Sequence, residues 1–133
     1  MNKKIAALAV AAAVAFGVSL GADEFTQKDQ ERWQKEYMSV VDKGRELFHS
    51  GALGTNGVAC GQCHPNGANT HPETYPKFQK QLGRVIALRE MINWCIQQPL
   101  EGKPLALDSA DMVALEAYVA YERRGVALAP GKH

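Results

Sequence analysis

One short motif constrains this chain more than any other feature, Cys60-Gly61-Gln62-Cys63-His64. Two cysteines three positions apart, with a histidine directly after the second, can belong to a zinc site, a disulfide-exchange centre or a haem attachment site. Each of these sites needs different residues elsewhere in the chain. The rest of the sequence therefore distinguishes them.

The zinc and disulfide-exchange alternatives find little support. Structural zinc needs four ligands, which usually come from two well-separated pairs. The chain has no second Cys-x-x-Cys or His-x-x-x-His pair, so only His71 and Cys95 could complete a set. A catalytic disulfide usually lies at a helix N-terminus near a βαβ unit, whereas the residues around this motif predict loops and helices.

Covalent haem attachment fits the motif in detail. In this arrangement both sulfurs bond to the haem vinyl groups, and the adjacent histidine ligates the iron. We therefore predict that Cys60 and Cys63 are the thioether anchors and that His64 is the proximal iron ligand. The chain has three cysteines and one such motif, which predicts a single haem c and leaves Cys95 free.

The first residues predict export. Lys3 and Lys4 precede an apolar run from Ile5 to Leu20, and small residues follow before Asp23. This order is typical of a signal peptide, so we expect residues 1–22 to be removed by cleavage near Ala22 and the remainder to be periplasmic. An uncleaved membrane anchor is the alternative, although the run is somewhat short for a span of about 20 apolar residues.

Size and charge limit the remaining possibilities. Cleavage leaves residues 23–133, a length typical of one domain, which we interpret as a monohaem cytochrome c domain. The full chain has 15 basic and 14 acidic residues, and loss of Lys3 and Lys4 leaves a net charge of −1. Without a basic run, nothing favours nucleic-acid binding.

Three helical segments are expected, over residues 28–49, 77–98 and 110–124. In each of them apolar residues recur at spacings of three and four. Thr26 and Ser109 are suitable N-caps for the first and third segments. Residues 50–76 contain many Gly and Pro residues and predict a long loop, which is uncommon unless it has a function.

Three stretches resemble class I cytochromes c: residues 44–48 (Gly-Arg-Glu-Leu-Phe), the Cys-x-x-Cys-His motif and residues 115–118 (Leu-Glu-Ala-Tyr). Residues 91–119 are more specifically similar to the haem domains of SoxA and thiosulfate dehydrogenases. The resemblance implies an all-α, class I cytochrome c-like fold, with three main helices around one covalently bound haem. It also implies that the first and last helices cross at Gly44, against Tyr118.

The resemblance implies a distal iron ligand as well. Family members usually carry a Met in the loop before the last helix, but residues 99–108 contain neither Met nor His. In the SoxA group a cysteine at the position of Cys95 ligates iron, and an Arg occupies the position of Met91. We predict that Met91 is the distal ligand, because a flexible thioether can reach iron from a helix, and Met112 and Cys95 remain alternatives.

The expected function is one-electron transfer in a periplasmic respiratory or redox chain. We expect an electron carrier rather than an enzyme, a monomer without stable membrane insertion after cleavage. Its partners would be redox proteins, namely other cytochromes or a membrane oxidoreductase. The alternatives are a sulfur-compound-oxidising haem enzyme or subunit that uses Cys95 as an iron ligand, and a haem sensor with an open sixth site.

Overall fold

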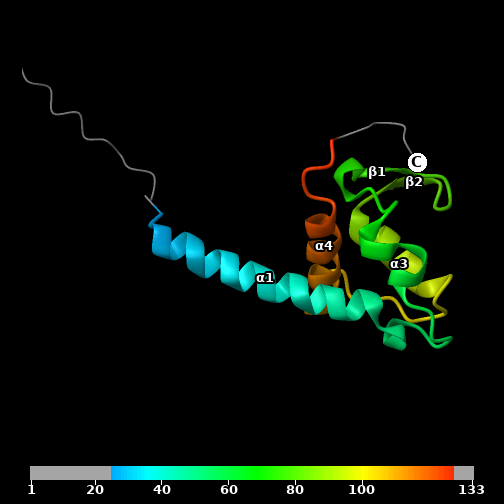
Figure 1. The fold of residues 1–133 in the computed structure, drawn as a ribbon. Helices are drawn as coiled ribbons and strands as arrows, with labels where there is room; N and C mark the ends of the chain where they lie inside the picture. Colours follow the sequence, from blue (N-terminus) through cyan, green and yellow to red (C-terminus); the bar gives the residue numbers. More distant parts are fainter. Residues whose placement is uncertain (1–24, 128–133) are drawn as a thin grey trace, which may run out of the picture.

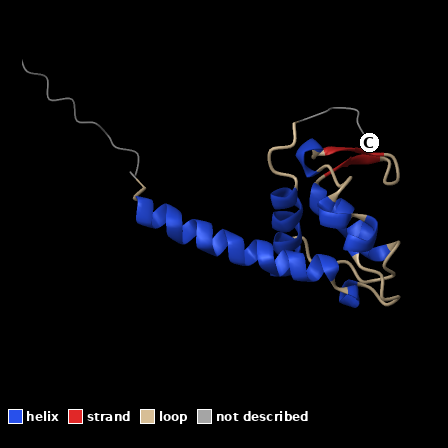
Figure 2. Ribbon diagram, viewed as in Figure 1, coloured by secondary structure: helices blue, strands red, loops and turns tan. Residues whose placement is uncertain are grey.

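The computed structural model describes residues 25–127, so the predicted signal peptide lies outside the described residues. Figures 1 and 2 show a mostly helical chain with one small hairpin. None of the helices among residues 25–127 is both long enough and apolar enough to cross a membrane. In chain order the elements are α1 (Gln27–His49), η1 (Gly51–Leu53), α2 (Cys60–Cys63), η2 (Pro65–Gly67), η3 (Pro72–Thr74), β1 (Lys77–Gln79), β2 (Arg84–Ile86), α3 (Leu88–Gln97) and α4 (Ala110–Glu122).

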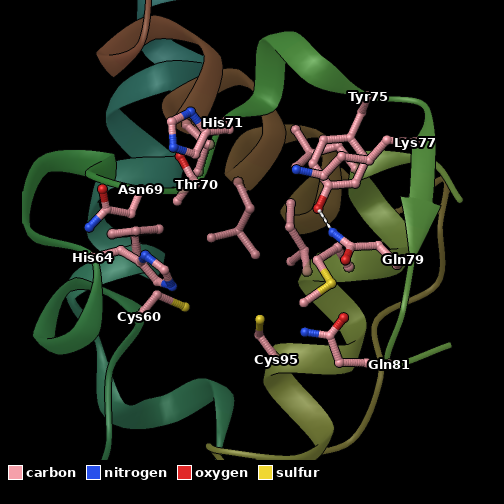
Figure 3. Close-up of a pocket in the computed structure, with 16 residues that line it drawn as sticks. Cys60, His64, Asn69, Thr70, His71, Tyr75, Lys77, Gln79, Gln81 and Cys95 are labelled. Atoms are coloured by element: carbon pink, nitrogen blue, oxygen red, sulfur yellow. Dashed lines mark hydrogen bonds between the residues drawn. The ribbon is translucent and has the colours of Figure 1, made fainter. Parts of the chain in front are cut away.

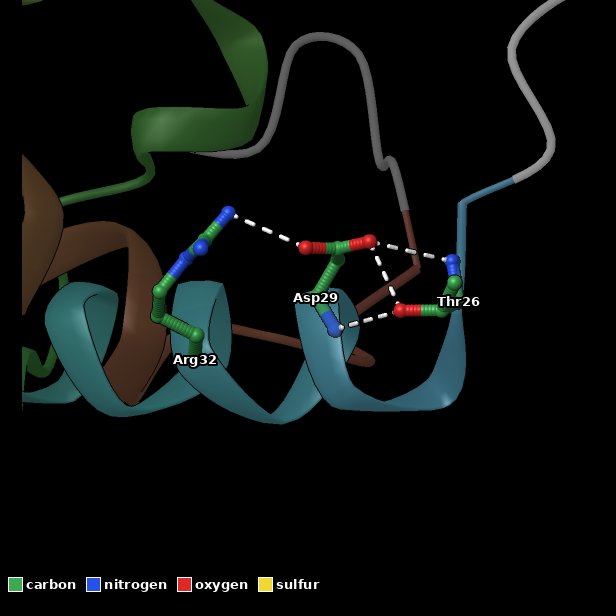
Figure 4. Close-up of polar contacts among 3 residues, drawn as sticks. All are labelled: Thr26, Asp29 and Arg32. Carbon is green, nitrogen blue, oxygen red and sulfur yellow. Dashed lines mark hydrogen bonds and ion pairs between the residues drawn. The ribbon is translucent and has the colours of Figure 1, made fainter.

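Helix α1 begins one residue before its predicted start and ends at the predicted residue. Its N-cap is Thr26, whose hydroxyl accepts a hydrogen bond from the Asp29 backbone N–H at 3.2 Å, while the Asp29 carboxylate accepts from the Thr26 backbone N–H at 3.2 Å (Figure 4). This reciprocal capping box satisfies two backbone donors that a helix start leaves unpaired. Arg32 extends it with an ion pair to Asp29.

Helices α1 and α4 cross at Gly44, as predicted. A Cβ atom at Gly44 would lie 1.9 Å from the Ala114 carbonyl oxygen and 2.7 Å from Tyr118 Cβ. Only a residue without a side chain allows the two backbones to approach this closely. The N-cap of α4 is Ser109, whose hydroxyl accepts from the Met112 N–H, and the helix ends two residues before the predicted boundary.

The second predicted helix is wrong over its first eleven residues, 77–87. Residues 77–86 form an antiparallel hairpin in which Phe78 pairs with Val85, and α3 begins only at Leu88. Gly83 adopts a left-handed φ of 66° and its N–H bonds to the Gln79 carbonyl at 2.8 Å, which closes the turn. A left-handed residue cannot continue a right-handed helix.

A single core joins the helices to the loop that carries the cysteine motif. The buried Asn93 side chain bonds to both backbone groups of Leu105 at 2.8 Å, which fixes the segment between α3 and α4 against α3. The Thr55 N–H donates to the Leu100 carbonyl at 3.0 Å and so ties the motif loop to the same segment. The core consists of Val41, Phe48, Cys60, Ile96, Leu100, Leu115, Tyr118 and Val119.

Candidate haem site

The two motif cysteines lie at the ends of α2, a single helical turn. Cys60 is buried and lines a cavity, whereas Cys63 is exposed. Gly61 lies between them because a Cβ atom there would meet the His49 ring nitrogen Nδ1 at 2.4 Å. The motif therefore lies tightly against the end of α1, with one sulfur facing the interior and one facing the surface.

The His64 ring is held in one tautomer. Its Nδ1 atom lies 2.8 Å from the Ala68 carbonyl oxygen. A carbonyl only accepts hydrogen bonds, so Nδ1 must carry a proton, and in the neutral ring Nε2 then keeps a free lone pair. Asn66 and Gly67 adopt left-handed conformations that turn the chain back to bring Ala68 into place. Such a bond to the remote ring nitrogen commonly orients a metal-ligating histidine.

The cavity beside His64 has a volume of about 270 Å³, far more than the roughly 10–15 Å³ that a single water needs. His64 and Cys60 approach it from the motif side, and Cys95 approaches it from α3 (Figure 3). Apolar residues complete much of its lining: Phe48, Leu88, Ile92, Leu115 and Val119. A thiol and an imidazole beside a largely apolar space suit a covalently held haem.

Zinc fits this region poorly. Within residues 25–127 no group of three or more His, Cys, Asp or Glu side chains is arranged to hold a metal ion by itself. Haem needs no such group, because the porphyrin supplies four of the iron ligands. The residues present therefore fit haem better than a protein-ligated metal.

The distal candidates are not equivalent in position. Met91 and Cys95 both line the cavity and lie one turn apart on α3. Met112 is 0% exposed, packs in the core and does not line the cavity. Burial, together with the nearby sulfurs of Cys60 and Cys63, raises the pKa of the Cys95 thiol to about 11. Met91 remains our predicted distal ligand, with Cys95 as the alternative.

The hairpin contributes cavity residues that the sequence analysis missed. Tyr75 precedes β1, and Lys77 and Gln79 on β1 face the cavity, while Phe78 between them is 61% exposed. The sequence analysis placed Tyr75 in the loop over residues 50–76 and Lys77 and Gln79 in a helix, so it did not use the strand-like alternation of residues 77–79. The alternating Lys77-Phe78-Gln79 pattern and Gly83 were the signals that could have revealed the hairpin.

A charged cluster lies beside the cavity. His71 lines the cavity, and its Nδ1 atom lies 3.1 Å from a Glu73 carboxylate oxygen, which is 3.7 Å from an Arg123 nitrogen. Burial alone would raise the pKa of Glu73, but its backbone hydrogen bond, the His71 contact and the Arg123 charge together hold that pKa below the ordinary value. The carboxylate is therefore stabilised in its charged form.

Glu73→Gln is expected to lower the free energy of unfolding at pH 7. A depressed folded-state pKa stabilises the protein above the ordinary carboxyl pKa of 4.5, and this contribution is lost as the pH falls through the folded-state pKa. The difference between variant and wild type should shrink below about pH 4.5 in denaturant titrations. Glu46→Gln, at an exposed site on α1, is the control. If the loss of unfolding free energy in Glu73→Gln were the same at every pH, this expectation would be contradicted.

Comparisons with known proteins agree with this site. The family described as "SoxA/TsdA, cytochrome c domain" matches residues 43–128. The thiosulfate dehydrogenase of Psychrobacter arcticus is 36% identical over 74 residues, which are 50% of this chain and 23% of that protein. The thiosulfate dehydrogenase of Allochromatium vinosum is 32% identical over 83 residues, 53% of this chain and 31% of that protein. The chain thus spans less than a third of the length of these relatives.

A solved structure supports the fold. A chain in the crystal structure of SoxXA from P. pantotrophus aligns with a TM-score of 0.64 at 21% identity, over 75% of this chain and 39% of that one. This similarity confirms the all-α, class I cytochrome c-like fold predicted from the sequence.

The comparisons correct one prediction. The sequence analysis expected an electron carrier and not an enzyme. The relatives that match this chain are named as enzymes, thiosulfate dehydrogenases in both cases above. The expectation that the protein is not an enzyme is therefore contradicted. The Met at position 91, where the SoxA group has an Arg, does not exclude a catalytic role.

Proposed function

Because this chain belongs to the SoxA/TsdA cytochrome c domain family, and is therefore a c-type cytochrome with covalently bound haem c, we propose that it transfers single electrons in the periplasm. Its one haem would be attached through Cys60 and Cys63. His64 would be the proximal iron ligand and Met91 the distal one. Residues 1–22 would direct export and be removed near Ala22.

The observation that carries this proposal is the contact between His64 Nδ1 and the Ala68 carbonyl oxygen. Donation from Nδ1 to the Ala68 carbonyl leaves Nε2 as the nitrogen available to iron, beside a cavity that Cys60 also lines. Met91, another residue of the cavity lining, comes from α3. When bound, haem supplies a one-electron redox couple. The chain's own residues would supply iron ligands and exclude water with apolar side chains, which would limit reorganisation.

Partner contact would occur near the exposed Cys63. Cys63 is exposed, so a haem attached to it would be accessible to another protein on that side. Electron-transfer encounters are typically brief and bury less than about 1,200 Å² in total. We expect redox proteins, such as other cytochromes or a membrane oxidoreductase, as the partners. We expect the protein itself to be a monomer.

The proposal is tested on the mature chain expressed with a cytochrome c maturation system. We expect one haem that survives denaturing electrophoresis and a potentiometric titration that fits a single one-electron couple. Cys60→Ala with Cys63→Ala should abolish covalent attachment. A colourless product, or haem retained by the double variant after denaturation, would overturn the proposal.

A second candidate function follows from Cys95, which lines the same cavity one turn from Met91. In this reading the protein is a haem subunit that oxidises a sulfur compound, with Cys95 as an iron ligand. Thiosulfate added to the oxidised holoprotein should then reduce the haem, and Cys95→Ser should abolish that reduction. Equal reduction rates in both proteins, or none in either, would remove this candidate.

A further inference from the structure

The hairpin side of the cavity carries an unneutralised cation. Lys77 lines the cavity, and its ammonium group lies 4.6 Å from the centre of the Tyr75 ring (Figure 3). A cation–π contact of this kind contributes about 0.5–1 kcal/mol and leaves the positive charge in place. No carboxylate within residues 25–127 forms an ion pair with Lys77.

Two arginines near the hairpin are already paired with carboxylates. Arg84 pairs with Glu90 at 2.7 Å, and Arg89 forms two hydrogen bonds to the Glu116 carboxylate at 2.7 and 3.2 Å. Neither arginine lines the cavity. Among the described lysines and arginines, Lys77 is the one that combines a place in the cavity lining with an uncompensated charge.

The Tyr75 hydroxyl adds a second donor beside Lys77. Gln79 Nε2 donates to the Tyr75 oxygen at 2.7 Å, which fixes the phenol and leaves its own proton free. Burial raises the pKa of Tyr75, with the nearby Cys95 acting in the same direction against the Gln79 hydrogen bond. The phenol therefore stays protonated and keeps its ability to donate.

The Lys77 ammonium and the Tyr75 hydroxyl are the kinds of donor that bind a carboxylate. Haem carries two propionate groups, which are anionic, and an ammonium with an adjacent hydroxyl can both donate to one carboxylate. We propose that Lys77 and Tyr75 hold one haem propionate, with Gln79 positioning the phenol. This inference rests on the proposed haem site and adds residues that neither the motif nor the family match assigns.

A propionate held by Lys77 should affect the reduction potential of the haem. An anionic propionate disfavours the addition of an electron to the haem, and a paired cation reduces that effect. Lys77→Gln should therefore favour the oxidised form. We expect the equilibrium constant for reduction to fall about tenfold, which corresponds to 59 mV for one electron.

The test compares the midpoint potentials of five holoprotein variants, one of them His71→Gln, with that of the wild type. Lys77→Gln should lower the midpoint potential, and Tyr75→Phe should lower it by a smaller amount. Lys77→Arg should keep a potential close to that of the wild type. Lys80→Gln is the matched control, because Lys80 is an exposed residue of the same hairpin and does not line the cavity. The NMR shifts of the propionate carboxyl carbons should move in Lys77→Gln and Tyr75→Phe but not in Lys80→Gln.

Two outcomes would overturn the inference while leaving the haem site intact. One is a holoprotein in which Lys77→Gln and Lys80→Gln have the same potential and the same carboxyl shifts. The other is a larger change of midpoint potential in His71→Gln than in Lys77→Gln. This result would place the propionate at the cluster of His71, Glu73 and Arg123 instead. If Lys77→Gln fails to fold, Lys77→Arg and Tyr75→Phe still decide through the carboxyl shifts. Absence of haem from the wild type would refute the proposed function instead.

Discussion

Gly44→Ala is expected to destabilise the holoprotein by about 2–4 kcal/mol, although alanine is the better helix former by roughly 1 kcal/mol. The added methyl group would lie 1.9 Å from the Ala114 carbonyl oxygen, which belongs to the backbone of α4 and cannot rotate away. The two helices must move apart, and this disrupts the packing of Phe48 and Tyr118, whose rings lie 5.1 Å apart.

Chemical denaturation followed by far-ultraviolet circular dichroism measures this effect. Lys43→Ala is the matched control, since it makes the neighbouring α1 position alanine at an exposed site. It should change stability by less than about 0.5 kcal/mol. If Gly44→Ala were as stable as this control, the close crossing of α1 and α4 would not be a feature of the folded protein.

The elements that the sequence predicted well are those with local signals. The Thr26 and Ser109 caps mark the starts of α1 and α4, because an N-cap acts within three residues of itself. The crossing at Gly44 depends on residues 70 positions apart, and only the family resemblance provided it. Local propensity alone does not specify such long-range contacts.

The hairpin shows why part of the site could not be predicted. Phe78, Leu82 and Val85 recur at helical spacing, yet Phe78 and Val85 face each other across two strands and both are 61% exposed. The short strands hold few residues, so the periodicity that distinguishes strand from helix is weak. This error removed Lys77 from the predicted cavity residues, whereas Cys60 and His64 were found from the motif alone.

The second large effect is expected from Met91→Ala. If Met91 ligates iron, its loss should abolish the weak far-red charge-transfer band of the oxidised protein. A neutral thioether favours Fe(II), so the midpoint potential should also fall, by on the order of 100 mV within the roughly 0.8 V range that axial ligands span. Absorption spectroscopy and potentiometry of the same sample measure both changes.

Cys95→Ala separates the two cavity candidates. Burial keeps the Cys95 thiol protonated unless iron binds it, and a thiolate ligand would favour Fe(III) and lower the wild-type potential sharply. We expect the band and the potential to be nearly unchanged in Cys95→Ala. Loss of thiolate features in this variant, with the band absent from wild type, would assign the distal position to Cys95 instead.

Met112→Ala completes the comparison because it separates ligation from packing. Met112 is fully buried and does not line the cavity, so its truncation should leave a void and cost about 2–5 kcal/mol of stability. The charge-transfer band should nevertheless persist below the unfolding transition. Met91 is only half-buried, so Met91→Ala should show the opposite combination, with a large spectral change and a smaller loss of stability. Loss of the band with only a small loss of stability in Met91→Ala would identify Met91 as an iron ligand, because a purely structural role would change stability without removing the band.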